Sequence, residues 1–138
     1  YVGIDQWLID AGLILKASNL TTLQLPLNAF ANRDDYRIYF ADHSLFIASL
    51  DDQAKNDLII NQNYNIYFGA LYESLIASSL HKQNIPLYFY RNKESTIELD
   101  FVIRINNQIV PIEVKKNNGR IVSAKTVMAN KKINVNMN

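Results

Sequence analysis

The feature that most constrains this chain is a hairpin signature from Thr96 to Lys116, reading TIELDFVIRINNQIVPIEVKK. Two strand-like runs flank Asn106-Asn107, a dipeptide that tolerates the left-handed backbone of a tight turn, so the runs are predicted to pair antiparallel. This pairing would bring Asp100 on the first strand toward Glu113 on the second. The hairpin therefore predicts a place where acidic side chains distant in sequence meet.

The two predicted strands combine charge with burial. Successive side chains of a strand alternate between faces, so Glu113 and Lys115 share one face of the second strand. Three apolar residues share the other face: Val110, Ile112 and Val114. On the first strand, Asp100 is embedded in an apolar alternation formed by Leu99, Phe101, Ile103 and Ile105. A carboxylate in such a strand costs free energy unless a partner compensates it, and either a divalent metal ion or Lys115 would do so.

Composition places the chain among soluble, folded proteins. With 138 residues and 49% hydrophobic content, it suits one domain or slightly more. The absence of cysteine excludes a disulfide framework and a thiolate metal site, and it fits a reducing cytosol. No apolar run is long enough to span a bilayer and no signal peptide is visible, so we expect a cytoplasmic protein with no membrane partner.

Charge is distributed unevenly along the chain. All 13 acidic residues fall at or before Glu113, and the cations that follow it are Lys115, Lys116, Arg120, Lys125, Lys131 and Lys132. A basic segment of this kind attracts phosphate backbones. The segment from Lys115 to Lys132 is therefore a candidate nucleic-acid contact, and a solvated lysine face on a short helix is the alternative.

The first half of the chain predicts an extension of a separate core. A helix ending before Gly12 and a strand over Leu13 to Ala17 are predicted, and together they are typical of the second half of a winged-helix unit. The alternative is that the helix is a lid packed on the core by Trp7. Leu20 to Asp35 is irregular and predicts loop, whereas Tyr36 to Phe40 alternates as a strand does. Asp42 is placed to cap a short helix through Ser49. The polar stretch Asp51 to Asn65 predicts a linker, which divides the chain into an extension, residues 1–62, and a core, residues 63–138.

The predicted core begins with the longest helical stretch, Tyr64 to Lys82. Glu73 lies at the centre of its stripe, where it either points into a site or sits at the boundary and extends its charge outward. A strand over Leu87 to Arg91 precedes the hairpin, and Pro111 should face a sheet edge because it lacks a backbone donor. A helix over Val122 to Asn130 and a final strand over Ile133 to Met137 would follow. The predicted fold is α+β, a mixed sheet flanked by helices, and we expect the core to continue beyond residue 138.

These residues resemble a known family. Asp100 followed by Glu113-Val114-Lys115 on an apolar strand is similar to the signature of the PD-(D/E)XK nuclease superfamily. The segments GALYESLIAS, YFYRNKESTIELDFVI and QIVPIEVKK resemble the nuclease-like domain at the C-terminal end of uncharacterised AAA-type ATPases of bacteria and archaea. So do YVGIDQWLIDAGLILKA and YRIYFADHSLFIASL, and the resemblance thus covers most of the chain.

The resemblance implies a restriction-endonuclease-like core, an upstream ATPase module and a metal-dependent phosphodiester hydrolase acting on DNA or RNA. Asp100, Glu113 and the backbone carbonyl of Val114 would hold Mg²⁺ or Mn²⁺, which prefer oxygen ligands. Lys115 would orient the attacking water or neutralise developing charge, and Glu73 would complete the site.

Two other functions stay open. The fold would be a catalytically inactive module that binds nucleic acid or protein and regulates the attached ATPase, or a purely structural domain in which Asp100 and Lys115 form an ion pair. His43 has no second histidine or cysteine at ligand spacing nearby and is expected to hold no metal. His81, at the end of the predicted helix, can interact favourably with the helix dipole when protonated, which explains it without catalysis. No glycine-rich phosphate loop is present, so ATP would bind only to an upstream module.

Overall fold

The computed structural model describes residues 3–60 and 67–114. Within these ranges the helices are α1 (Ile4–Asp10), the short 3-10 helix η1 (Leu27–Phe30), α2 (His43–Ser49), α3 (Asp52–Ile59) and α4 (Phe68–Lys82). The strands are β1 (Ile14–Leu20), β2 (Ala31–Phe40), β3 (Tyr88–Arg91), β4 (Glu98–Leu99), β5 (Phe101–Ile105) and β6 (Gln108–Ile112). The predicted α+β class is confirmed, with two sheets among the described residues in place of the single mixed sheet that was expected.

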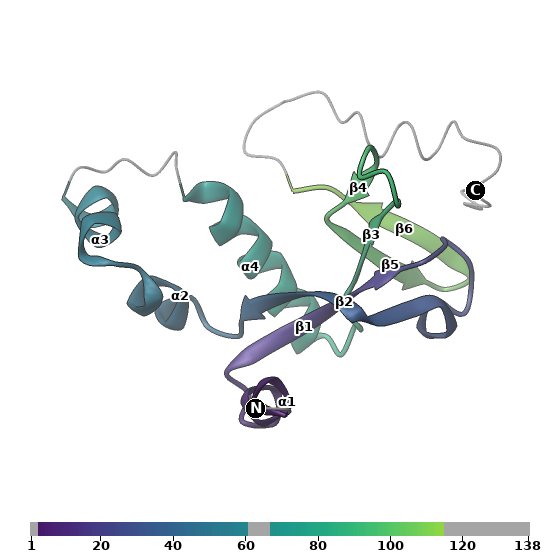
Figure 1. The fold of residues 1–138 in the computed structure, drawn as a ribbon, viewed down its shortest axis with the longest axis horizontal. Helices are drawn as coiled ribbons and strands as arrows, with labels where there is room; N and C mark the ends of the chain where they lie inside the picture. Colours follow the sequence, from purple (N-terminus) through teal and green to yellow (C-terminus); the bar gives the residue numbers. More distant parts are fainter. Residues whose placement is uncertain (1–2, 61–66, 115–138) are drawn as a thin grey trace.

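The larger sheet is mixed and has the strand order β2-β1-β3-β4. β1 pairs antiparallel with β2 and parallel with β3, and β3 pairs antiparallel with β4. The chain between β2 and β3 contains α2, α3 and α4, and Figure 1 shows α2 and α3 on the side of the molecule away from β5 and β6. Strands on both sides of the predicted boundary at residue 62 therefore share one sheet.

Two buried clusters hold the elements together. The first joins α4 to the sheet and to β5, and its largest members are Tyr39, Phe89 and Phe101. The second includes residues of the segment between β1 and β2, and its members are Leu20, Leu23, Leu27, Leu99, Val102 and Ile109. Phe89 and Phe101 are both fully buried, and burial of one such side chain stabilises a fold by about 1.5–3 kcal/mol. The α4 helix is therefore fixed against the sheet by large apolar contacts.

The predicted hairpin forms as β5 and β6. Asn106 has the left-handed backbone (φ 56°) that the turn requires, and Phe101 pairs with Ile112. Pro111 lies opposite Val102 on β6, whose only partner among the described strands is β5, as expected for a residue without a backbone donor. Val110, Ile112 and Val114 all pack against the first cluster, which confirms their predicted common face.

The first strand of the hairpin is interrupted at Asp100. The sequence predicted that Leu99 and Phe101 share a face, but Leu99 packs in the second cluster and Phe101 in the first. The prediction was wrong because the chain bends at Asp100, between β4 and β5, and leaves one sheet for the other. Asp100 therefore lies at a bend between the two sheets.

Two predicted irregular segments are regular. The segment before Asp35 was expected to be loop, but β2 begins at Ala31. Its polar residues are accommodated because β2 is an edge strand with exposed side chains, and its register with β1 shifts between Ser18 and Asn19. The predicted linker after Asp51 contains α3, which Asp51 caps by accepting a hydrogen bond from the Ala54 N–H. Ala54 and Leu58 are buried on this helix, so a short apolar stripe suffices to dock it.

Other predictions are confirmed or lie outside the described residues. Asp42 caps α2 by accepting a hydrogen bond from the Ser44 N–H at 2.6 Å, as predicted. The segment from Lys115 to Asn138, with its predicted helix and strand, lies outside the described residues. Among the helices that the structure describes, none is long and apolar enough to cross a membrane.

Candidate functional site

The hairpin brings two of the predicted site residues together. Asp100 and Glu113 directly flank the last pair of the hairpin, Phe101–Ile112, and the charge of Glu113 acts on Asp100. The Val114 N–H donates a hydrogen bond of 2.8 Å to Asp100 Oδ2, which ties the bend to the second strand. Asp100 and Glu113 are both partly buried. This end of the hairpin therefore holds two carboxylates in a partly dehydrated environment.

The third predicted acid approaches the same region from α4. The Tyr39 hydroxyl on β2 donates a hydrogen bond of 3.2 Å to Glu73 Oε2, so the Glu73 carboxylate faces the sheet. Burial, followed by the negative charge of Asp100, raises the pKa of Glu73 above its usual range. Glu73 is partly buried and its carboxylate is paired with Tyr39, and its predicted place in a catalytic site stays a prediction.

Asp100 is the central member of the three acids. Burial raises the pKa of Asp100, and the negative charge of Glu113 raises it further, while the hydrogen bond from the Val114 N–H opposes both effects. The charge of Asp100 in turn acts on Glu73. Asp100 therefore lies within electrostatic reach of both Glu73 and Glu113.

Three residues of this region were not singled out from the sequence: Arg37, Tyr39 and Glu98. Arg37 and Tyr39 lie two apart on β2 and share a face, and Arg37 forms an ion pair with Glu98 of β4. Burial and the charge of Glu73 raise the pKa of Tyr39 to about 12, so its hydroxyl remains protonated at neutral pH. The sequence showed that side chains alternate from Tyr36 to Phe40. It did not show that the face carrying Arg37 and Tyr39 turns toward α4.

The donor set partly fits a divalent cation. Carboxylate oxygens are the ligands that Mg²⁺ and Mn²⁺ prefer, and a cation would relieve the crowding of negative charge around Asp100. Within residues 3–60 and 67–114, however, no group of three or more His, Cys, Asp and Glu side chains lies at metal-binding spacing. The predicted ligand set, formed by Asp100, Glu113 and the Val114 carbonyl, has only two such side chains and stays a prediction. Lys115 lies outside the described residues.

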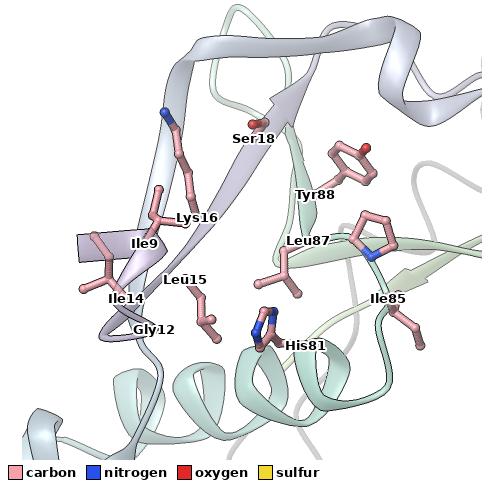
Figure 2. Close-up of a pocket in the computed structure, with 11 residues that line it drawn as sticks. Ile9, Gly12, Ile14, Leu15, Lys16, Ser18, His81, Ile85, Leu87 and Tyr88 are labelled. Atoms are coloured by element: carbon pink, nitrogen blue, oxygen red, sulfur yellow. The ribbon is translucent and has the colours of Figure 1, made fainter. Parts of the chain in front are cut away.

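A separate pocket lies on another part of the molecule. It has a volume of about 350 Å³ and is lined by residues of α1, β1, the end of α4 and the start of β3. Figure 2 shows the His81 ring on α4 lying beneath the apolar side chains of Leu15 and Leu87. Glu73, Asp100 and Glu113 are not among its lining residues. The carboxylates of the candidate site therefore do not belong to this pocket.

The fold and the site together define an α+β domain with three carboxylates gathered between a helix and a hairpin. The sequence model of a protein family, described as a domain of unknown function (DUF4143), matches residues 68–137, which is half of the chain. The chain belongs to this family. The match begins at α4 and includes Glu73, Asp100, Glu113 and Lys115. No curated protein and no solved structure matches the chain.

Proposed function

We propose that this chain is a nuclease-like domain that hydrolyses phosphodiester bonds of DNA or RNA with the help of Mg²⁺ or Mn²⁺. The observation that carries the proposal is the position of Asp100, at the bend between two sheets and electrostatically coupled to both Glu73 and Glu113. Carboxylates gathered from a helix and a hairpin supply the residue types that this chemistry needs. The pattern Asp100, Glu113, Lys115 adds to this support through its resemblance to the PD-(D/E)XK signature.

The residues have separable roles in such a reaction. Asp100, Glu113 and the Val114 carbonyl would hold the cation, which supplies charge neutralisation and a more acidic water. Glu73 is suited to exchange a proton with water, because its raised pKa brings it nearer to neutrality than an ordinary glutamate. The Tyr39 hydroxyl orients Glu73 through its hydrogen bond. Lys115 would neutralise negative charge that develops on the phosphate.

A second candidate function is a catalytically inactive module that binds nucleic acid or protein. The observation that favours it is that two of the acids already have protein partners, since Glu73 accepts a hydrogen bond from Tyr39 and Asp100 accepts one from Val114. Under either function we propose an AAA-type ATPase module upstream, nucleic-acid contact through Lys115 to Lys132, and a cytoplasmic location. In the inactive case, the domain would regulate that ATPase.

Cleavage separates the two candidates. The 138-residue chain is incubated with end-labelled single-stranded and double-stranded DNA and RNA, with Mg²⁺, Mn²⁺ or EDTA. We expect metal-dependent cleavage that Asp100→Asn and Glu113→Gln abolish, whereas Glu94→Gln, at an exposed acid of the β3–β4 turn, leaves it unchanged. Cleavage that survives Asp100→Asn would contradict the proposed site. Binding of the same substrates without cleavage would select the inactive module.

Metal binding gives a readout that does not depend on turnover. Titration of Mn²⁺ into the chain, followed by calorimetry, should give saturable binding that weakens in Glu113→Gln. Because a cation that binds the folded state stabilises it, the midpoint of thermal unfolding should also rise with Mn²⁺ concentration. Equal binding by the wild-type chain and by Glu113→Gln would place any cation elsewhere.

A further inference from the structure

Among the residues that the structure describes, Arg37 is a cation that acts on the carboxylate cluster. Its Nη2 atom forms an ion pair with Glu98 Oε1, and its guanidinium carbon lies 4.3 Å from the centre of the Phe89 ring. The positive charge of Arg37 lowers the pKa of both Glu73 and Asp100, which opposes the upward effect of burial on these acids. Arg37 therefore lies within electrostatic reach of the predicted reaction centre.

The surroundings of Arg37 restrict the position of its guanidinium. Phe89 is fully buried, and stacking on its ring restricts the guanidinium plane. The Tyr39 hydroxyl also interacts with Arg37, and it donates to Glu73, so a continuous polar path runs from Glu98 to Glu73. A guanidinium has five N–H donors, which suits it to oxygens of a phosphate.

The partner of Arg37 is easily replaced. The Glu98 side chain is 44% exposed, whereas that of Arg37 is 22% exposed. An ion pair open to solvent on one side contributes little to stability, so exchange of Glu98 for another anion costs little. A phosphodiester close to three carboxylates needs a cation to offset repulsion, and Arg37 is placed to provide it.

We propose that Arg37 binds a non-bridging phosphate oxygen of the substrate and that Glu98 occupies the guanidinium until the substrate displaces it. The assignment takes its substrate class from the proposed function. It adds Arg37 of β2 as a substrate-binding residue and Glu98 of β4 as an internal anion that competes with the substrate. Neither residue belongs to the pattern formed by Asp100, Glu113 and Lys115.

Binding without metal tests the assignment. A fluorescein-labelled oligothymidylate is titrated with the chain in EDTA, and dissociation constants are measured by fluorescence anisotropy. Arg37→Gln should weaken binding by about ten-fold or more, the loss expected when a charge-assisted hydrogen bond to phosphate is removed. Arg33→Gln, at an exposed position of the same strand, measures the general effect of losing one positive charge.

Substitution of Glu98 should change the affinity for the oligonucleotide in the opposite direction. Glu98→Gln should tighten binding, because it releases Arg37, and it should do so by more than Glu94→Gln, which removes one negative charge from an exposed turn. An oligothymidylate with an uncharged methylphosphonate backbone should bind Arg37→Gln and the wild-type chain equally. If circular dichroism shows that Arg37→Gln is unfolded, the Glu98→Gln comparison decides alone.

The outcomes distinguish this assignment from the proposed function. A loss in Arg37→Gln no larger than in Arg33→Gln, or no tightening in Glu98→Gln beyond Glu94→Gln, overturns the role of Arg37. Cleavage that Asp100→Asn abolishes, combined with unchanged binding by Arg37→Gln, overturns only this role. Absence of cleavage by the wild-type chain, combined with the binding changes described, overturns hydrolysis and keeps Arg37 as a phosphate-binding residue.

Discussion

Phe101 connects the core to the candidate site, so its truncation is the most informative stability experiment. The side chain is fully buried in the cluster shared with α4, and its ring centroid lies 5.4 Å from that of Tyr39. Truncation of a buried phenylalanine to alanine typically costs about 3–5 kcal/mol, of which the aromatic pair accounts for about 0.5–1.5 kcal/mol. A domain of this size is stable by about 5–15 kcal/mol. Phe101→Ala should therefore remove a large fraction of the free energy of unfolding.

The measurement is urea unfolding at neutral pH, followed by far-ultraviolet circular dichroism. Trp7 fluorescence is a poor probe because this side chain is 66% exposed on α1. The matched control is Ile105→Ala on the same strand, where the side chain is 49% exposed and the expected cost is below about 1 kcal/mol. An equal loss of unfolding free energy in the two variants would refute the packing of β5 between α4 and the second cluster.

Three further predictions concern single polar groups. Tyr39→Phe removes the hydroxyl that stabilises ionised Glu73, so the pKa of Glu73 should rise further in a carbon-13 NMR titration; an unchanged or lower value would contradict the hydrogen bond. The raised pKa of Asp100 means that the folded state holds this proton more tightly than the unfolded state, so its ionisation penalises folding above the unfolded value of about 4. In urea unfolding, Asp100→Asn should therefore gain stability relative to the wild-type chain as the pH rises from about 4 to about 7, and a constant difference would argue against a buried, crowded carboxylate. Asp42→Ala removes the acceptor of the Ser44 N–H and should lower the urea midpoint in the same assay, and an unchanged midpoint would show that α2 does not depend on this cap.

Local patterns predicted the elements whose causes are local. The turn at Asn106 needs a residue that accepts positive φ, and the cap at Asp42 needs a short acceptor, so both could be identified from neighbouring residues alone. The sequence also singled out Glu73 on the helix and Asp100 and Glu113 on the hairpin, and their role as site residues stays a prediction. It missed α3 and the early start of β2, because polar composition outweighed the few apolar residues that dock these segments.

The partners of the acids required the tertiary structure. Arg37 and Tyr39 are more than 30 residues from Glu73 and about 60 from Glu98 and Asp100. The pattern of a single strand does not show which of its faces turns toward α4. The bend at Asp100 likewise results from the need of the chain to supply Leu99 to one cluster and Phe101 to the other.

The amino-acid sequence by itself determined the hairpin, the order of the acids and the α+β class, because turn residues and alternating apolar side chains act over a few neighbouring positions. Only the tertiary structure decided that the strand divides at Asp100, that Tyr39 holds Glu73, and that Arg37 lies between Phe89 and Glu98. These features depend on the packing of segments distant in the chain, where the shape of two buried clusters selects which polar groups meet.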